Sequence, residues 1–142
     1  MKKSILLLLI VSIVSGLSAC TSNDKPIPTD QLPEKALVFL KQYFYGVDVI
    51  SVEKDKKTYE VKLAEGSAVE FDKHGEWKEV ECSKGIPGAI IPQGVFKYVA
   101  SKYDRSVRMV KIERTKHGYE VDLSNHVELI FDKNGDFVKV DD

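Results

Sequence analysis

The residues whose types and spacing come nearest to a metal site are Asp132, Asn134 and Asp136, which carry oxygen at alternate positions. Alternating oxygen ligands open the calcium loops of EF-hand proteins, which continue with a glycine at position six and a bidentate glutamate at position twelve. Here position six is Phe137, and no glutamate follows it. A turn accounts for the pattern better, because aspartate accepts local hydrogen bonds and the neighbouring glycine supplies a positive φ.

No other motif in the sequence indicates catalysis or metal binding. The histidines, His74, His117 and His126, lie at no metal-ligand spacing from one another or from a cysteine. The sequence contains neither a nucleophile elbow nor a glycine-rich phosphate loop. We therefore expect a protein that is not an enzyme and that has no catalytic residues, no cofactor and no metal site.

Cys20 is a candidate for lipid attachment. A short basic start, an apolar run over residues 4–14 and the sequence LSAC at residues 17–20 form the pattern of a secretory signal peptide. The apolar run is shorter than the roughly 20 residues that a membrane span needs. Small residues before a cysteine resemble the bacterial lipobox, in which Cys20 becomes the first mature residue and carries lipids. The alternative is an ordinary signal peptide cut near Ala19, which leaves a plain thiol.

The predicted organisation follows from this cleavage site. Residues 1–19 are the lipoprotein-type signal peptide, and residues 20–32, which contain two prolines, are a tether. The mature chain has 19 basic and 22 acidic residues, so its net charge is −3. Nucleic acid is not an expected partner, because it would require a basic stripe. We expect a protein of the cell envelope, anchored to the outer membrane through lipid on Cys20 and facing the periplasm, with surface exposure as the alternative.

The elements that position these residues come from an internal repeat. FDKHGEW at residues 71–77 recurs as FDKNGDF at residues 131–137, and the match at this offset of 60 extends to the strands on both sides. Each unit reads as one helix with a three-and-four apolar spacing, followed by four strands that alternate apolar and polar residues. The units are residues 33–82 and 92–142, joined by residues 83–91. Together they predict an α+β fold with two helices over an antiparallel sheet of about eight strands.

The lipobox, the two repeats and the FDxxG-aromatic turns resemble the PepSY-like family of small secreted Bacteroidetes proteins, which is described as beta-lactamase-inhibitor-like. The resemblance covers residues 33–142 and also includes the Tyr-Glu-Val strands that begin at residues 59 and 119. It implies one curved antiparallel sheet with helices on the convex side and an open concave face. It also implies binding or inhibition rather than catalysis, and it supplies no catalytic residues.

The register of the two hairpins decides which aromatic residues are exposed. Two-residue loops at residues 74–75 and 134–135 would pair Phe131 with Val138 and Leu129 with Val140. Trp77 and Phe137 would then point to the open face. This register sorts apolar from polar residues better in the second repeat, and we favour it, although it turns Lys78 inward in the first. The alternative is a type I turn with a bulge, which places Trp77 on the same face as Phe71.

Two functions remain open on these observations. The favoured one is a lipid-anchored binding module whose open sheet face captures an envelope protein, such as a hydrolase that it inhibits. Large aromatics on an exposed face are typical anchors for a protein partner. The candidate contact residues are Trp77, Phe137, Glu79 and Lys139. The alternative is a periplasmic module that senses a small ligand or a cation, which the acidic turns at Asp72 and Asp132 favour.

Overall fold

The computed structural model of the chain describes residues 25–141. The predicted signal peptide, Cys20 and the first part of the predicted tether lie outside these residues. Within them, no helix is long and apolar enough to cross a membrane.

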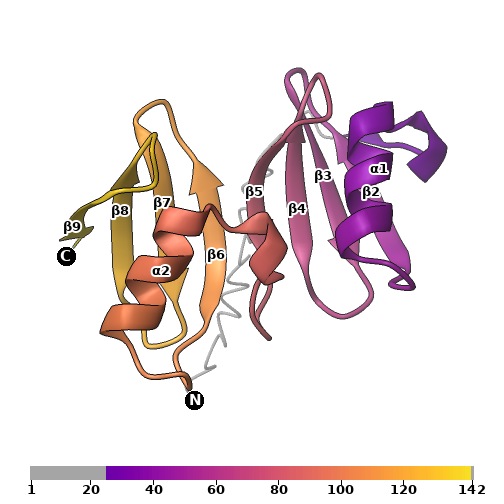
Figure 1. Cartoon of the computed structure of the whole chain (residues 1–142). Helices are drawn as coiled ribbons and strands as arrows, with labels where there is room; N and C mark the ends of the chain where they lie inside the picture. The colour runs from indigo at the N-terminus through magenta and orange to yellow at the C-terminus, as the bar shows by residue number, and fades with distance from the viewer. Residues whose placement is uncertain (1–24, 142) are drawn as a thin grey trace, which may run out of the picture.

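Two repeats of similar architecture lie side by side (Figure 1). The first repeat consists of α1 (Glu34–Tyr43), β2 (Val49–Lys54), β3 (Thr58–Leu63), β4 (Ala68–Asp72) and β5 (Trp77–Glu81). The second consists of α2 (Gln93–Lys102), β6 (Met109–Arg114), β7 (Gly118–Leu123), β8 (Glu128–Asp132) and β9 (Phe137–Asp141). Three short elements complete the described part of the chain: β1 (Lys25–Pro26), η1 (Thr29–Gln31) and η2 (Gly88–Ile90).

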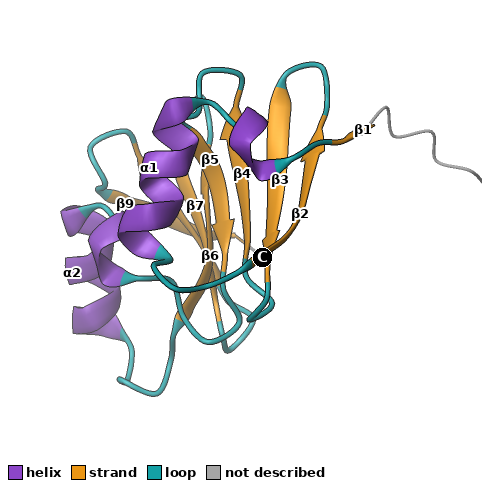
Figure 2. Ribbon diagram, turned by 90° about the vertical axis from the view of Figure 1, so that its right-hand side faces the viewer, coloured by secondary structure: helices purple, strands orange, loops and turns teal. Residues whose placement is uncertain are grey.

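The strands form one antiparallel sheet of nine strands whose spatial order, β1 to β9, is their order in the sequence. Both helices lie on the same side of this sheet, and within residues 25–141 no helix covers its other face, which we call the open face (Figure 2). The predicted fold is therefore confirmed, with β1 added to the eight strands of the two repeats. This added strand comes from the predicted tether. Its two residues pair with Glu53 and Lys54, and Leu32 is buried in the core.

The alternation of side chains explains which face the helices cover. Val61, Phe71 and Val80 are fully buried on three adjacent strands, and their sequence neighbours point to the open face. A proline precedes each helix, where its missing amide costs no hydrogen bond. Each helix then buries a narrow apolar stripe on the sheet, with Ala36 and Leu40 in α1 and Val95 and Val99 in α2. One continuous core therefore lies between the helices and the sheet.

The turn in each FDxxG motif contains a bulge, so the favoured two-residue loop is wrong at this point. Asp72 accepts hydrogen bonds at its Oδ1 from the amides of His74 (2.8 Å) and Glu76 (3.0 Å), and Gly75 has a φ of 85°. Phe71 pairs with Trp77, whereas Glu70 pairs with Glu79, so Lys78 is the extra residue of the bulge. The turn interpretation of the acidic motif is thus supported by its geometry.

The second repeat has the same turn. Asp132 accepts from the amides of Asn134 (2.9 Å) and Asp136 (3.0 Å), and Phe131 pairs with Phe137. Beyond the bulge Leu129 pairs with Val140, as both the favoured register and the structure have it. Only the residues next to the turn change face, because the extra residue is absorbed there.

Candidate functional site

The open face of the sheet carries a row of six glutamates on six adjacent strands. The strand register places each of them directly opposite the next, from Glu53 through Glu60, Glu70, Glu79 and Glu113 to Glu120. Ile130 and Lys139 continue the row on β8 and β9. All six glutamates are partly buried by their neighbours. Because like charges opposite one another destabilise a sheet, this row opposes the stability of the fold. We call it the glutamate row.

Lysines on the same face offset only part of this charge. Ion pairs join Lys62 to Glu60 (3.8 Å), Lys78 to Glu70 (3.5 Å) and Lys111 to Glu79 (3.5 Å). Within residues 25–141, the other three glutamates of the row take part in no ion pair. The parallel row one step along the strands holds two lysines and four acids, namely Lys62, Glu81, Lys111, Asp122, Glu128 and Asp141. The open face is therefore acidic as a whole.

The electrostatics of Glu79 reflect its position inside the row. Partial burial raises the pKa of its carboxyl above the ordinary value, and the charges of Glu113 and Glu70 raise it further, against the opposing effect of Lys111. The pKa of the Glu128 carboxyl is also raised, first by desolvation and then by its acidic neighbours, among them Asp122 and Asp141. Ionisation of the carboxyls on this face is thus unfavourable, and a nearby cation would make it less so.

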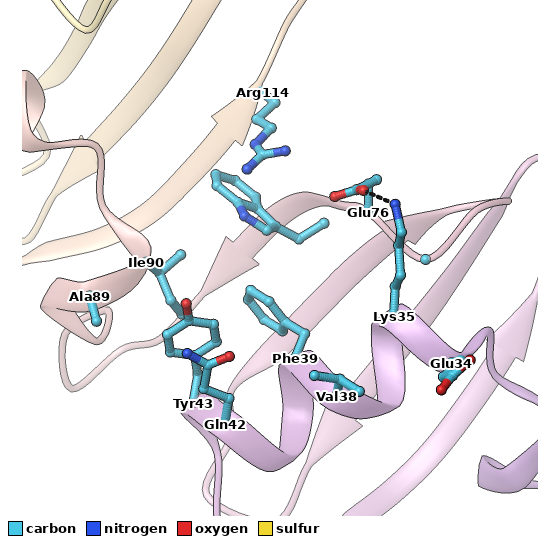
Figure 3. A pocket seen from close by; sticks show the side chains of 12 residues that line it. Glu34, Lys35, Val38, Phe39, Gln42, Tyr43, Glu76, Ala89, Ile90 and Arg114 are labelled. Carbon is cyan, nitrogen blue, oxygen red and sulfur yellow. Dashed lines mark hydrogen bonds and ion pairs between the residues drawn. The ribbon is translucent and has the colours of Figure 1, made fainter.

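A second candidate is a groove of about 600 Å³ at the seam of the two repeats, between α1, the start of β5, η2 and the end of β6 (Figure 3). Its apolar wall includes Val38, Phe39 and Ile90, and its charged rim includes Glu34 and an ion pair between Lys35 and Glu76 with a length of 2.6 Å. A groove of this size falls in the range of small-molecule sites. On its α1 side, Val38 is 55% exposed.

Trp77 lines this groove and does not lie on the open face. It is 7% exposed, and the Arg114 guanidinium lies 3.8 Å from the centre of its ring. Arg114 belongs to the second repeat and Trp77 to the first, so this cation–π contact fastens the two repeats together.

The four residues that the sequence suggests as a contact surface are divided between two faces. Glu79 and Lys139 lie in the same row on the open face. Trp77 and Phe137 lie on the helix side, opposite Phe71 and Phe131, so their expected place on the open face is wrong. Phe137 is 37% exposed and stacks on Tyr98 of α2. The structure therefore brings together the charged pair but not the aromatic pair with it.

The glutamate row itself was missed, although the sequence contains a signal for it. Each of the six strands has a glutamate next to a buried apolar residue, as in Tyr59-Glu60-Val61 and Tyr119-Glu120-Val121. Alternation places such a glutamate on the open face in every strand. Their alignment into one row, however, depends on the register of five strand pairs, and periodicity alone does not provide that register.

Among residues 25–141, no group of three or more His, Cys, Asp or Glu side chains is arranged to hold a metal ion. The acidic turn motifs use one oxygen of Asp72 and one of Asp132 for their own backbone, as described above. The open face and the seam groove both carry side chains that are suited to recognition.

Comparison with known proteins gives a consistent relationship. The model of the family described as "Putative beta-lactamase-inhibitor-like, PepSY-like" matches residues 19–67 and 57–139. No curated protein matches the chain. A solved structure described as a "putative calcium-regulated periplasmic protein" from Bacteroides thetaiotaomicron is similar, with 41% identity and a TM-score of 0.80, over 84% of this chain and 98% of that one.

Two structures from Bacteroides vulgatus are also similar. A periplasmic protein of the DUF2874 family has 38% identity and a TM-score of 0.80, over 86% of this chain and 99% of that one. A periplasmic protein of unknown function has 36% identity and a TM-score of 0.78, over 84% of this chain and 99% of that one. The family model, the repeats and the shared fold agree, and the chain belongs to the PepSY-like family of beta-lactamase-inhibitor-like proteins.

Proposed function

We propose that this protein is a lipid-anchored, non-catalytic binding module of the cell envelope that captures a basic protein surface on its open sheet face. The glutamate row is the observation that carries the proposal. Six carboxylates held opposite one another oppose folding, and a partner that brings lysine or arginine to the row would relieve their repulsion. Charge complementarity of this kind gives specificity and a fast association rate.

The dimensions of the row favour a protein as the ligand. Adjacent strands lie about 4.8 Å apart, so six strands extend over about 24 Å. That length matches a protein interface of standard size better than a small molecule. A hydrolase of the envelope is the partner class that we favour, because the family is described as inhibitor-like.

An envelope or periplasmic location is supported by the similar structures, which are described as periplasmic. We add to this the proposed anchor at Cys20. Only four residues lie between Cys20 and Lys25, where β1 begins. At about 3.5 Å per residue, β1 would lie within roughly 18 Å of the lipid. The open face would then act on partners close to the membrane surface.

A pull-down from envelope extract tests the function. The wild-type protein is compared with Glu60→Gln/Glu79→Gln/Glu113→Gln, which neutralises the middle of the row without changing side-chain volume. The matched control is Glu34→Gln/Glu65→Gln/Glu76→Gln, in which three carboxylates outside the row are removed. We expect one or more basic proteins to be recovered with the wild type and the control and to be lost with the row variant. Equal recovery with all three proteins would reject the open face as the site.

A second candidate function, sensing of a cation, is favoured by one observation. A similar structure at 41% identity is described as calcium-regulated. Opposed carboxylates such as those of Glu70 and Glu79 offer oxygen ligands of the kind that calcium accepts. Thermal melting with and without millimolar calcium, with magnesium as the control cation, separates this candidate from protein binding. An unchanged melting temperature in calcium would remove it.

A further inference from the structure

The last strand of the sheet, β9, has an open outer edge. Among residues 25–141 it pairs with β8 and with no other strand. Its five residues are all exposed, including Val138 (56%) and Val140 (42%). An edge with exposed apolar residues and unpaired backbone groups is a template for the addition of a further strand.

The internal repeat shows what such an edge accepts. β5 is the counterpart of β9 at the offset of 60, and its outer edge is occupied by β6. Glu79, Val80 and Glu81 pair there with Glu113, Ile112 and Lys111 of β6. Val80 is fully buried as a result, whereas its counterpart Val140 is not. An added strand would therefore bury Val140, as β6 buries Val80.

The direction of the backbone groups follows from the same comparison. The amide of Cys82 donates to the carbonyl of Val110 at 2.8 Å, so Cys82 and Val110 form a hydrogen-bonded pair. Such pairs alternate along an antiparallel ladder, which makes Val80 the next residue whose amide and carbonyl face β6. By the repeat, Val140 directs its amide and carbonyl away from β8, toward the open edge.

At the opposite end of the sheet, β1 covers the outer edge of β2. β2 is the counterpart of β6, but Lys25–Pro26 already pairs with Glu53 and Lys54 of β2, and the amide of Ile27 donates to the carbonyl of Val52 at 2.9 Å. A second molecule therefore cannot add its β2 to β9 in the way that β6 adds to β5. Head-to-tail growth through β2 is blocked, so we take β9 as the strand that each copy contributes to self-association.

We propose that two copies of this protein pair through their β9 strands, antiparallel and about a two-fold axis at Val140. Val140 then exchanges two backbone hydrogen bonds with the partner's Val140. Lys139 lies opposite the partner's Asp141, and Asp141 lies opposite the partner's Lys139. Opposite charges at directly opposed positions stabilise an antiparallel pair, and Lys139 and Asp141 already lie on the same face of the strand, 2.7 Å apart.

The charge pattern selects this register over its neighbours. A two-fold axis at Lys139 would oppose two lysines, which is unfavourable. An axis at Val138 would oppose Lys139 to the partner's Phe137 and leave no ion pair between the strands. Only the axis at Val140 combines outward backbone groups, an apolar contact on the helix side and two ion pairs on the open side.

Pairing in this way gives one sheet that runs through both molecules. Opposed residues of an antiparallel pair point to the same face, so the two open faces join into one. The proposed protein-binding surface would thus extend across the dimer. The dimer itself does not depend on that function, because it rests on the edge and not on the glutamate row.

Charge reversal at the edge tests the dimer directly. The full chain, exported from its own leader with Cys20→Ser so that no lipid is attached, is studied by sedimentation equilibrium. We expect the parent to dimerise, and Lys139→Asp and Asp141→Lys each to weaken the dimer about tenfold. The double variant Lys139→Asp/Asp141→Lys restores complementarity and should restore the dimer. Lys62→Asp, on the open face of β3, is the control and should leave it unchanged.

Each result decides the proposal. A parent that stays monomeric at 100 µM, or single and double variants that dimerise equally, would overturn it. Far-UV circular dichroism shows whether each variant is folded. As a second variant, Val140→Pro removes the outward amide and should give a folded monomer, whereas a dimer of Val140→Pro with wild-type affinity would refute the pairing of β9 with β9.

Discussion

The rings of Tyr98 and Phe137 lie almost parallel, with their centroids 4.2 Å apart and 8° between their planes. Both rings also meet Phe131 edge-on, at 5.6 Å and 5.9 Å. The corresponding rings of the first repeat are Phe39 and Trp77, and there the Arg114 guanidinium lies on Trp77 instead. The aromatic ring at this position is thus covered by the guanidinium of Arg114 in the first repeat and by the ring of Tyr98 in the second.

The stack between Tyr98 and Phe137 should be measurable as a coupling energy. Tyr98→Leu and Phe137→Leu each remove one ring and keep an apolar side chain. We expect the double-mutant cycle to give a coupling of about 1 kcal/mol in favour of the native pair. Urea unfolding measures the three variants and the wild type. Strictly additive losses would show that the stacked geometry contributes nothing beyond apolar burial.

The contact between Arg114 and Trp77 can be followed by fluorescence, because Trp77 is the single tryptophan of the chain. Arg114→Gln uncovers one face of the indole, so we expect its emission to move to longer wavelength. The free energy of unfolding should fall by about 1 kcal/mol. Arg105→Gln, in the exposed loop after α2, is the control and should leave both unchanged. An unshifted Arg114→Gln spectrum would contradict the contact.

The raised pKa of Glu79 predicts how stability depends on pH. The folded protein binds a proton at Glu79 more tightly than the unfolded chain does, so this group destabilises the fold above its folded pKa. This loss of stability disappears as the pH falls toward 4.5, the ordinary pKa of a glutamate carboxyl. Glu79→Gln should therefore melt at a higher temperature than the wild type at pH 7.

The difference in melting temperature between Glu79→Gln and wild type should also shrink as the pH falls through the raised pKa of Glu79 toward 4.5. Thermal melts at several pH values follow it. Added salt should reduce the difference at pH 7, because the repulsion within the glutamate row is screened. A variant that is less stable than the wild type at pH 7 would mean that the ion pair with Lys111 outweighs burial and repulsion.

Gly94 in α2 lies against the turn of the second hairpin. A Cβ at Gly94 would come within 2.5 Å of the carbonyl oxygen of Gly135, which is backbone and cannot move aside without shifting the turn. Gly94→Ala should therefore destabilise the protein by roughly 1–3 kcal/mol. Helix propensity alone predicts the reverse, a gain of up to about 1 kcal/mol, so chemical denaturation distinguishes the two by sign.

The first repeat supplies a matched control for Gly94. Lys35 occupies the corresponding position of α1, and its side chain is exposed in an ion pair with Glu76. Because exposed ion pairs contribute little, Lys35→Ala should leave the stability almost unchanged. If Gly94→Ala proves as harmless as Lys35→Ala, the close approach of α2 to the turn does not restrict this position.

The repeats and the strands were predictable from the sequence because each has a local signal. Apolar alternation located the strands, the offset of 60 duplicated them, and the proline before each helix marked its start. β1 was not predicted, because a strand of two residues, one of them Pro26, is too short to show an alternation of apolar and polar side chains. It is a strand only because the outer edge of β2 accepts it.

The bulge was harder to predict for a different reason. Polarity sorting selects the register of a whole strand, and over most of β9 that register is right, with Leu129 opposite Val140. The bulge moves only the residue next to the turn. Asp72 with Gly75, and the inward Lys78 that the two-residue loop demanded, were the local signals in favour of the bulge. These signals came from single residues, whereas the apolar and polar alternation of the whole strand favoured the two-residue loop.

The strictly sequential order of the strands has a consequence for how the chain folds. Every strand pairs only with strands that are its neighbours in the sequence, so the sheet contains no crossover within the described residues. The widest gap lies between β5 and β6, where α2 intervenes. Proteins rich in local contacts fold rapidly, so each repeat can form its hairpins early and independently. Docking of β6 on β5 is then the step that turns two marginal units into one cooperative domain.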